Sequence, residues 1–452
     1  MTTGGVPTEP GAGWVTARTG AALTTDREVA LLALRRNPKR AHLLVSTLLG
    51  KHLPVTGDVV LSAAAELGAH VRGAVTATPF VIGFAETATG LGHGVARVCS
   101  ADGGQAPYAH TTRRPVPAGA HVVSFEEEHS HAVEQVLAVL DDTLLRDPSR
   151  PVVLVDDELS SGRTAVNAIR VLQRRWPRRQ YVLASLLDVR TPAQRLDNAA
   201  EVAGLGAELS SVSLVDGSVQ LPADLPSLTA GLLAEGGTAA AIAPGPAAPV
   251  TTWALTVAGS LTGAFGWGVD DEEALRSAVA LLADRLQLPG SVLVLGDEEF
   301  LYPGQLLAQA LGQRTRTSST TRSPALVVDQ PGYPLRTVLR FAATDDAGRE
   351  AFAYNVVPSR QLDRGPAPGF DHVVLLLDRP VPPHHRDGLL RQLSAAATTS
   401  VQLVLVDEGG AVGAVRCSSS ARSDGLRTVR QGGQQVDDAV TDAGDAEDLR
   451  PP

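Results

Sequence analysis

Residues 151–169, PVVLVDDELSSGRTAVNAI, contain an apolar run, two adjacent carboxylates, a hydroxyl-rich turn and the start of an expected helix. The apolar run has no polar alternation, which is typical of a strand buried on both faces of a parallel sheet. Asp156 and Asp157 follow it directly and repel each other, so we expect a nearby ligand that compensates them. A strand, a turn and a helix in this order form the repeating unit of an α/β protein.

The turn after this strand has the composition of a phosphate-binding loop. Gly162 permits a positive φ, and the free N–H groups at a helix start attract phosphate. Hydroxyls come from Ser160, Ser161 and Thr164. The two carboxylates would repel a bare phosphate, so the ligand should also present hydroxyls or a metal ion, as a ribose 5-phosphate does. The alternative is an acid pair that merely ends a buried strand.

Two other protein classes also place carboxylates at a strand end. A response-regulator receiver domain requires a lysine near the end of a later strand, but no lysine follows Lys51. A P-loop ATPase requires G-x-x-x-x-G-K-[ST]. The only Gly-Lys pair, Gly50-Lys51, has Val45 at the first glycine position and is followed by His52. The sequence excludes both classes.

The remaining chain divides into two regions in which strands and helices alternate, which predicts mainly parallel α/β sheets. The first region has expected strands at 80–85, 121–125, 152–156 and 182–188, and expected helices at 26–36, at 131–145 and after residue 164. The second has expected helices at 271–286 and 302–312, and expected strands at 291–296, 325–329, 372–378 and 401–407. The predicted organisation is a disordered N-terminus (1–13), a first α/β domain (14–216), a linker (217–250), a second α/β domain (251–415) and a disordered acidic tail (416–452).

Composition limits the function classes. The chain of 452 residues has a net charge of −10, which argues against a nucleic-acid-binding protein, because phosphate backbones are bound by surplus Lys and Arg. Cys99 and Cys417 lie far apart, which favours a reducing compartment over a disulfide framework. The N-terminus lacks signal-peptide features, and no apolar run approaches the roughly 18 residues of a membrane helix. We expect a cytoplasmic protein without a membrane partner.

The segment VVLVDDELSSGRT is similar to the signature loop of type I phosphoribosyltransferases, which bind phosphoribosyl pyrophosphate (PRPP). The resemblance implies that Asp156 and Asp157 hold the ribose 2- and 3-hydroxyls and a Mg²⁺ ion. It also implies a PRPP-binding loop made of Glu158, Leu159, Ser160, Ser161, Gly162, Arg163 and Thr164. Fixed carboxylates would stabilise the ribosyl cation-like transition state, and magnesium on the pyrophosphate would ease its departure.

A second strand–turn–helix, VIGFAETATGLGHGV (81–95), resembles the pyrophosphate loop of the same fold. The loop would consist of Ala85, Glu86, Thr87 and Ala88. Lys51, one of only two lysines in the chain, and His52 are expected near the site, with chance as the alternative for Lys51. Arg113 and Arg114, in YAHTTRRPV (108–116), are candidates for a catalytic pyrophosphate clamp. The alternatives are a glycine-rich connection and a solvated basic turn. The roles of Glu127, His129 and His131 stay open between metal or acid–base chemistry and a charged helix start.

Combined with NPKRAHLLVSTLLGKHLPV and EEEHSHA, these motifs resemble the orotate phosphoribosyltransferase-like proteins of tellurium-resistance (stress) operons. That branch carries a C-terminal domain named after a Thr-Arg-Ser-Pro (TRSP) motif, which occurs here at 321–324. The resemblance makes 14–216 a phosphoribosyltransferase domain and 251–415 a TRSP-type domain. Orotate-type enzymes use a lysine in the mobile loop over the site, whereas 100–120 has only arginines, so orotate is not the expected acceptor.

The second domain repeats the motif logic of the first. Strand 291–296 ends at Asp297 and Glu298, and Pro324 disfavours a helical Ser323, which predicts an extended, hydroxyl-rich loop. We therefore expect a second ligand site, the alternative being a Ser/Thr-rich surface loop. Its members would be Asp297, Glu298, Thr321, Arg322 and Ser323.

The sequence thus predicts a Mg²⁺-dependent phosphoribosyltransferase, in nucleotide metabolism, that joins the ribosyl group of PRPP to a base-like acceptor. Two alternatives stay open: a PRPP- or nucleotide-sensing regulator that has lost the chemistry, and an enzyme that runs the reverse phosphorolysis. The acceptor is not identified, and a homodimer is left open.

Overall fold

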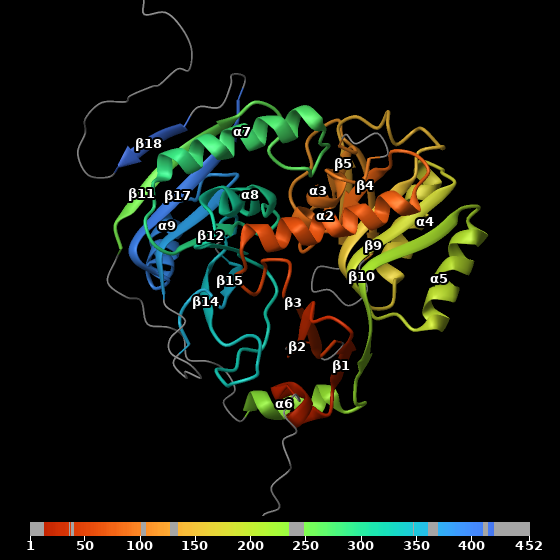
Figure 1. The fold of residues 1–452 in the computed structure, drawn as a ribbon, viewed down its shortest axis with the longest axis horizontal. Coiled ribbons are helices and arrows are strands. Elements are labelled where there is room, and N and C mark those ends of the chain that lie inside the picture. Colours follow the sequence, from red (N-terminus) through yellow and green to blue (C-terminus); the bar gives the residue numbers. More distant parts are fainter. Residues whose placement is uncertain are drawn as a thin grey trace, which may run out of the picture.

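The computed structural model describes residues 13–35, 37, 40–100, 105–126, 134–234, 248–346, 348–359, 369–409 and 415–419. Two six-stranded sheets form the frame of the molecule, one from each half of the chain (Figure 1). Helices α2 (Gly57–Ala74) and α8 (Tyr302–Leu311) lie between the two sheets. This architecture confirms the predicted fold class, two successive α/β domains with mainly parallel sheets.

The first sheet has five parallel strands and one antiparallel edge strand. In sheet order they are β1 (Ala22–Thr25), β10 (Glu208–Gln220), β9 (Gln180–Asp188), β8 (Val152–Leu159), β4 (Phe80–Gly83) and β5 (Tyr108–His110). The apolar part of β8 is buried throughout, as its unbroken Val/Leu run predicts. One face packs against α2 and α3 (Thr89–Ala96). The other packs against α4 (Arg163–Arg175) and the hairpin of β6 (His121–Glu126) and β7 (Glu134–Val139).

The second sheet is also parallel except for one edge strand. In sheet order its strands are β13 (Thr315–Ser319), β12 (Val292–Gly296), β16 (Phe370–Leu377), β17 (Ala397–Glu408), β11 (Val250–Val257) and β18 (Val415–Ser419). Helices α7 (Val269–Leu286) and α8 cover one face. Helix α9 (Pro383–Ser394) and the hairpin of β14 (Val338–Ala342) and β15 (Glu350–Tyr354) cover the other. The remaining elements are α1 (Trp14–Thr19), β2 (Ala30–Leu34), β3 (His42–Ser46), α5 (Pro192–Gly204) and α6 (Leu225–Ala234).

The two domains share one hydrophobic core. The cluster that contains Tyr108 of β5 also contains Tyr302 of α8, and both side chains are fully buried. Backbone hydrogen bonds also cross the interface, for example from His110 N to Gly263 O at 2.8 Å. At Gly57 the backbones of α2 and α8 approach so closely that a Cβ would lie 2.4 Å from Gln309 N. The domains are therefore packed as one body.

Two predicted helices are wrong. Residues 26–36 contain β2, which forms an antiparallel hairpin with β3, and residues 131–145 contain β7, which pairs with β6. Short apolar runs fit a helix or a strand equally well, and in both cases pairing with a neighbouring strand decides the conformation. The predicted strand 325–329 is also wrong, since Ala325 makes only an isolated bridge to Arg35.

Regular secondary structure extends across the predicted boundary between the first domain and the linker. β10 runs through residue 216 to Gln220 and pairs with β1 there. Helix α6 occupies 225–234 inside the expected linker. Residues 1–12 of the expected disordered N-terminus and 420–452 of the expected acidic tail lie outside the described residues.

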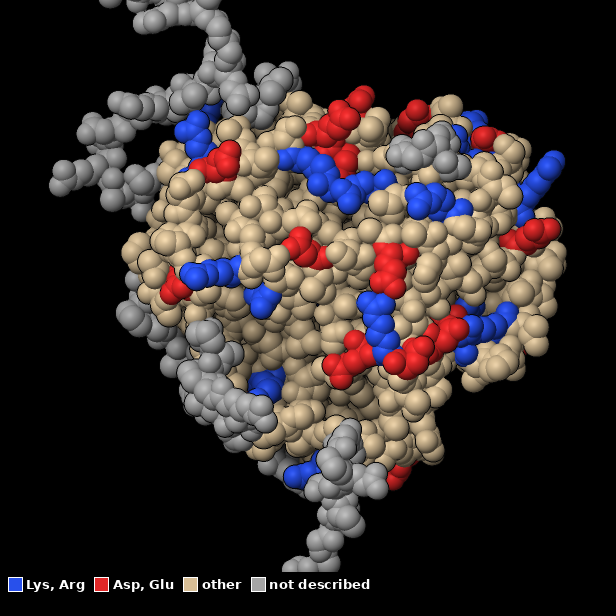
Figure 2. Space-filling view, in the orientation of Figure 1, with Lys and Arg blue, Asp and Glu red and all other residues tan. Residues whose placement is uncertain are grey.

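Among the described residues, no helix has the length and apolar composition needed to cross a membrane. On the face seen in Figure 2, Lys and Arg side chains alternate with Asp and Glu side chains instead of forming a continuous basic surface.

Candidate functional site

A cavity of about 340 Å³ lies at the carboxyl ends of β4 and β8. In parallel α/β sheets this edge is where ligands bind. Both domains line it. The lining residues from the first domain are Arg35, Arg40, Leu43, Leu44, Lys51, His52, Phe84, Ala85, Glu86, Thr87, Arg113, Gln135 and 156–165, and those from the second are Arg322, Ser323 and Arg349.

The predicted acid pair and the predicted phosphate loop line the same cavity. Asp156 and Asp157 belong to β8, which continues to Leu159 and so is longer than predicted. The backbone N–H of Asp157 donates to Asp156 Oδ1 at 3.0 Å. Glu158 forms an ion pair with Arg40, from the β2–β3 connection, so its carboxylate has a protein partner. The structure thus brings together 156–164 as one continuous wall.

Gly162 gives this wall its shape. Its φ of 77° lies in the left-handed region, and the residue directly precedes α4, as the sequence predicts. A Cβ at this position would lie 2.1 Å from Asn198 Oδ1. That oxygen accepts a hydrogen bond from Arg190 Nη1, and Arg190 is itself paired with buried Asp188. The close approach of this network to the loop requires glycine.

The predicted pyrophosphate loop follows β4. Ala85, Glu86 and Thr87 line the cavity, whereas Ala88 is buried beneath them and precedes α3. The Ala85–Glu86 peptide bond is cis. Hydrogen bonds hold the loop at both backbone groups of Ala85: its N–H donates to Thr111 Oγ1 at 2.8 Å, and its carbonyl accepts from Gln135 Nε2 at 2.7 Å.

Lys51 lies against this loop, as predicted. Its Nζ is 3.3 Å from Glu86 Oε1 and donates to Thr87 Oγ1 at 2.8 Å. Burial by itself would raise the pKa of Glu86, but the nearby Lys51 charge and hydrogen bonds from Thr321 and Arg322 lower that pKa to about 2. Glu86 is therefore an ionised, buried carboxylate at neutral pH.

The TRSP motif reaches the same cavity. Arg322 and Ser323 line it, and the backbone N–H of Arg322 donates to Glu86 Oε2 at 3.3 Å. Thr321 is fully buried. The sequence predicts a separate site in the second domain, whereas the structure brings Arg322 and Ser323 to the cavity that the first domain also lines.

The acids at the end of β12 lie behind the cavity wall. Asp297 accepts from Thr320 Oγ1 at 2.8 Å and Thr344 Oγ1 at 2.6 Å. Glu298 Oε2 accepts from Arg322 Nε at 2.7 Å, and Glu298 Oε1 lies 2.7 Å from Arg349 Nη2. Burial and the neighbouring carboxylates raise the pKa of Glu298 to about 7, against the opposing effect of the arginines. Glu298 therefore anchors the lining cations Arg322 and Arg349, and neither Asp297 nor Glu298 is itself a lining residue.

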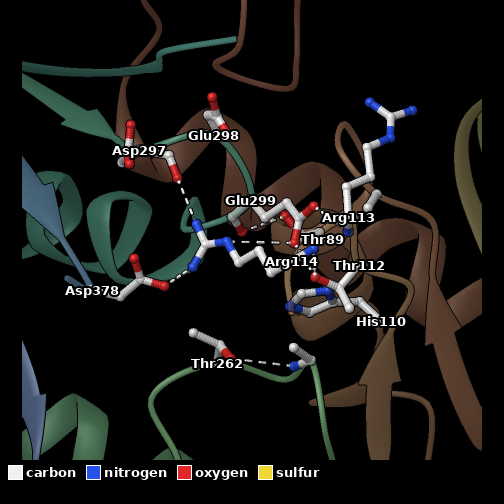
Figure 3. A network of polar contacts seen from close by, with 12 residues as sticks. Thr89, His110, Thr112, Arg113, Arg114, Thr262, Asp297, Glu298, Glu299 and Asp378 are labelled. Atoms are coloured by element: carbon white, nitrogen blue, oxygen red, sulfur yellow. Dashed lines mark hydrogen bonds and ion pairs between the residues drawn. The ribbon is translucent and has the colours of Figure 1, made fainter. Parts of the chain in front are cut away.

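The adjacent arginines Arg113 and Arg114 lie in different environments (Figure 3). Arg113 lines the cavity. Arg114 points into the domain interface, where it pairs with Asp378 and lies 3.7 Å from Glu299. Burial lowers the pKa of Arg114. Of the two residues predicted to clamp pyrophosphate, the structure places one at the cavity.

Three lining arginines were not predicted from the sequence. Arg35 and Arg40 flank the β2–β3 turn, and Arg349 directly precedes β15. His52, which follows Lys51, also lines the cavity. His52 is buried, and burial together with the Lys51 and Arg35 charges lowers its pKa to about 3. His52 is expected near the site together with Lys51, whereas no sequence signal indicates the three arginines. Glu127, His129 and His131 lie outside the described residues.

The described residues contain no cluster of three or more His, Cys, Asp or Glu side chains that would hold a metal by themselves. Mg²⁺ commonly uses one or two carboxylates together with substrate phosphates. Asp156 and Asp157 supply two carboxylates at the cavity. The donor set therefore fits a magnesium ion that arrives with a phosphorylated ligand.

Two regions of the chain match known sequence families. Residues 29–218 match the family described as phosphoribosyl transferase, and residues 261–393 match the TRSP domain that lies C-terminal to it. No curated protein matches the chain.

The chain is also similar to solved phosphoribosyltransferase structures. With Giardia lamblia adenine phosphoribosyltransferase, complexed with 9-deazaadenine, it shares 20% identity over 34% of this chain and 77% of that chain, at a TM-score of 0.24. With Trypanosoma brucei adenine phosphoribosyltransferase, in complex with AMP, pyrophosphate and ribose 5-phosphate, it shares 12% identity. The similarity covers 42% of this chain and 76% of that chain, at a TM-score of 0.28. With Aeropyrum pernix orotate phosphoribosyltransferase it shares 20% identity over 41% of this chain and 88% of that chain, at a TM-score of 0.25.

At these identities and TM-scores, the assignment rests on the two sequence-family matches. The first half of the chain is a phosphoribosyltransferase domain. More particularly, the chain combines that domain with a C-terminal TRSP domain, and Arg322 and Ser323 of the second domain's Thr-Arg-Ser-Pro motif line the cavity.

Proposed function

We propose that this protein binds PRPP and transfers its ribose 5-phosphate group to a base-like acceptor, with release of pyrophosphate. One observation carries the proposal: a single cavity contains the acid pair Asp156–Asp157, the loop 160–164 and the loop 85–87. These three groups match the three parts of PRPP, which are the ribose hydroxyls, the 5-phosphate and the pyrophosphate.

In this proposal the loop 160–164 and the N-terminus of α4 bind the 5-phosphate. The first N–H groups of a helix have no intrahelical acceptor and carry partial positive charge. Ser160, Ser161 and Thr164 add hydroxyl donors. Asp156 and Asp157 accept hydrogen bonds from the ribose hydroxyls, which fixes the sugar ring relative to the pyrophosphate loop.

The reaction breaks the bond between C1 and the pyrophosphate oxygen and forms a bond between C1 and an acceptor nitrogen, which loses its proton. Positive charge develops on the ribosyl group in the transition state, and fixed carboxylates stabilise it without reorganisation. The departing pyrophosphate gains negative charge next to Lys51 and Arg113. A Mg²⁺ ion held by Asp156, Asp157 and the pyrophosphate would neutralise part of that charge.

Isothermal titration calorimetry with PRPP and Mg²⁺ tests the binding step. The wild type should bind, and the double variant Asp156→Asn/Asp157→Asn should lose binding while its melting temperature stays close to that of the wild type. Asp197→Asn, an exposed carboxylate in α5, is the matched control and should bind like the wild type. Equal binding by the wild type and the double variant would contradict the proposal.

Pyrophosphate release tests the chemical step. A panel of purine, pyrimidine and related bases is added with PRPP, and free pyrophosphate is measured in both reaction directions. Binding without release from any base would favour the sensing regulator. Turnover only from a nucleotide and pyrophosphate would favour the reverse phosphorolysis.

A further inference from the structure

Two arginines of the second domain lie at the cavity formed by the first. Arg322 and Arg349 both line it, as does Ser323. Arg322 belongs to the TRSP motif, and Arg349 directly precedes β15. Nothing in the first domain's own sequence pattern requires these side chains, so their presence at its cavity needs a physical explanation.

Acidic side chains hold both guanidinium groups in place from behind. Glu298, whose side chain is fully buried, lies 2.6 Å from Arg322 Nη2 and 2.7 Å from Arg349 Nη2. Asp345 pairs with both arginines as well and also lies 3.8 Å from Arg379. Among the described residues, buried Arg349 Nη1 has no hydrogen-bond acceptor. The arginines are therefore pre-positioned donors with capacity for another anion.

The position of Arg322 relates this pair to one particular loop. Its backbone N–H donates to Glu86 Oε2 at 3.3 Å, in the loop 85–88. The Thr321 hydroxyl also bonds the Glu86 carboxylate. The second domain therefore contacts the first at the expected pyrophosphate loop.

The first domain leaves a charge requirement at this loop. Lys51 and Arg113 are the first-domain cations at this loop, but Lys51 Nζ is 3.3 Å from the Glu86 carboxylate, and both of those side chains are buried. That pairing neutralises most of the charge Lys51 would otherwise present to a ligand. Pyrophosphate is the most highly charged part of PRPP and needs further cations. Of the described lining residues, Arg322 and Arg349 are the second-domain cations available to it.

We infer that Arg322 and Arg349 bind the pyrophosphate group of PRPP, so that the TRSP domain supplies part of the phosphoribosyltransferase site. This inference rests on the proposed function. Guanidinium groups bind phosphate oxygens bidentately. Glu298 keeps the guanidinium groups of Arg322 and Arg349 oriented before the substrate binds. The TRSP motif then has a direct part in substrate binding, in addition to its contact with Glu86.

The test compares the affinities of the full-length protein for PRPP and for ribose 5-phosphate, each with Mg²⁺, by calorimetry. The ratio of the two affinities reports the pyrophosphate contribution. Arg349→Gln is the first variant, because Arg322 still pairs with Glu298 in it. Arg322→Gln is the second, because Arg349 still pairs with Glu298 in it. Arg336→Gln is the control, since Arg336 pairs with Asp329 and is not a lining residue.

In both test variants we expect PRPP affinity to fall about tenfold or more, with ribose 5-phosphate affinity unchanged within about twofold and the control like the wild type. An unchanged affinity ratio in a folded Arg349→Gln protein overturns the inference, as does an equal loss for both ligands. If PRPP binding depends on Asp156 and Asp157 while the arginine variants keep the wild-type ratio, only this inference fails. If the wild type binds neither ligand, the proposed function fails with it.

Discussion

Lys51 Nζ lies 3.3 Å from Glu86 Oε1 in a buried ion pair at the loop that follows β4. Both side chains are almost completely shielded from solvent, so each charge depends on the other for compensation. The pair also connects the two domains, because Glu86 accepts from the backbone of Arg322 and Ser318 Oγ donates to Lys51 O at 2.9 Å. Stability and the shape of the candidate site are therefore linked at this point.

Replacing Lys51 with Met should lower the free energy of unfolding by about 3 kcal/mol, because it leaves the Glu86 carboxylate buried without its cation. The double variant Lys51→Met/Glu86→Gln should recover most of that loss, since both charges are then removed. Urea denaturation followed by circular dichroism measures both. A Lys51→Met protein as stable as the wild type would show that the pair makes no net contribution.

Gly162→Ala should damage the phosphate loop in two ways. A positive φ costs a non-glycine residue about 1 kcal/mol or more, and the new Cβ would lie 2.1 Å from Asn198 Oδ1. Gly206→Ala is a matched control, since its φ is 82° and nothing lies within 4 Å of the added Cβ. We expect both variants to lose stability in urea denaturation, but only Gly162→Ala to weaken ribose 5-phosphate binding. Equal ligand affinity in the two variants would contradict the assigned role of the loop.

Substitutions of Arg113 and Arg114 should have different effects, one on PRPP binding and the other on protein stability. Arg113→Gln should weaken PRPP binding about tenfold with little change in melting temperature, because Arg113 lines the cavity. Arg114→Gln should lower the unfolding free energy by about 3 kcal/mol, because it leaves Asp378 and Glu299 without this cation. Its PRPP affinity, measured on folded protein, should match that of the wild type. The reverse pattern in calorimetry and thermal denaturation would place the clamp at Arg114 instead.

His52 should contribute to acid sensitivity. Burial, together with Lys51 and Arg35, lowers its pKa from 6.5 to about 3. Between these two values the unfolded chain binds a proton that the folded protein does not, so stability falls as the pH falls. The loss approaches about 1.4 kcal/mol per pH unit. A folded His52→Gln variant should show a shallower decline between pH 6.5 and 4.5 in urea titrations, whereas substitution of exposed His70 should leave the wild-type slope. Parallel curves for wild type and His52→Gln would refute this.

The strand–turn–helix at 151–169 could be predicted from the sequence because its determinants are local. An unbroken apolar run, the acid pair and Gly162 each restrict the backbone within a few residues, and the structure has β8, a left-handed glycine and α4 in that order. The same local logic predicts β12 and α8 in the second domain.

Non-local pairing explains what could not be predicted. Residues 30–34 and 134–139 are short apolar segments whose conformation depends on the strands opposite, β3 and β6. The different environments of Arg113 and Arg114 depend on the second domain, which supplies Asp378 and Glu299. Sequence spacing also carries no information that Arg322 and the loop 160–164 line one cavity.

Tyr108 and Tyr302 belong to one buried cluster, although they lie in regions of the chain that match different sequence families. Neither half of the polypeptide buries this apolar surface without the other. A fragment that ended after β10 would expose the apolar side chains of this cluster to water. Chaperones would bind that surface and proteases would degrade the fragment.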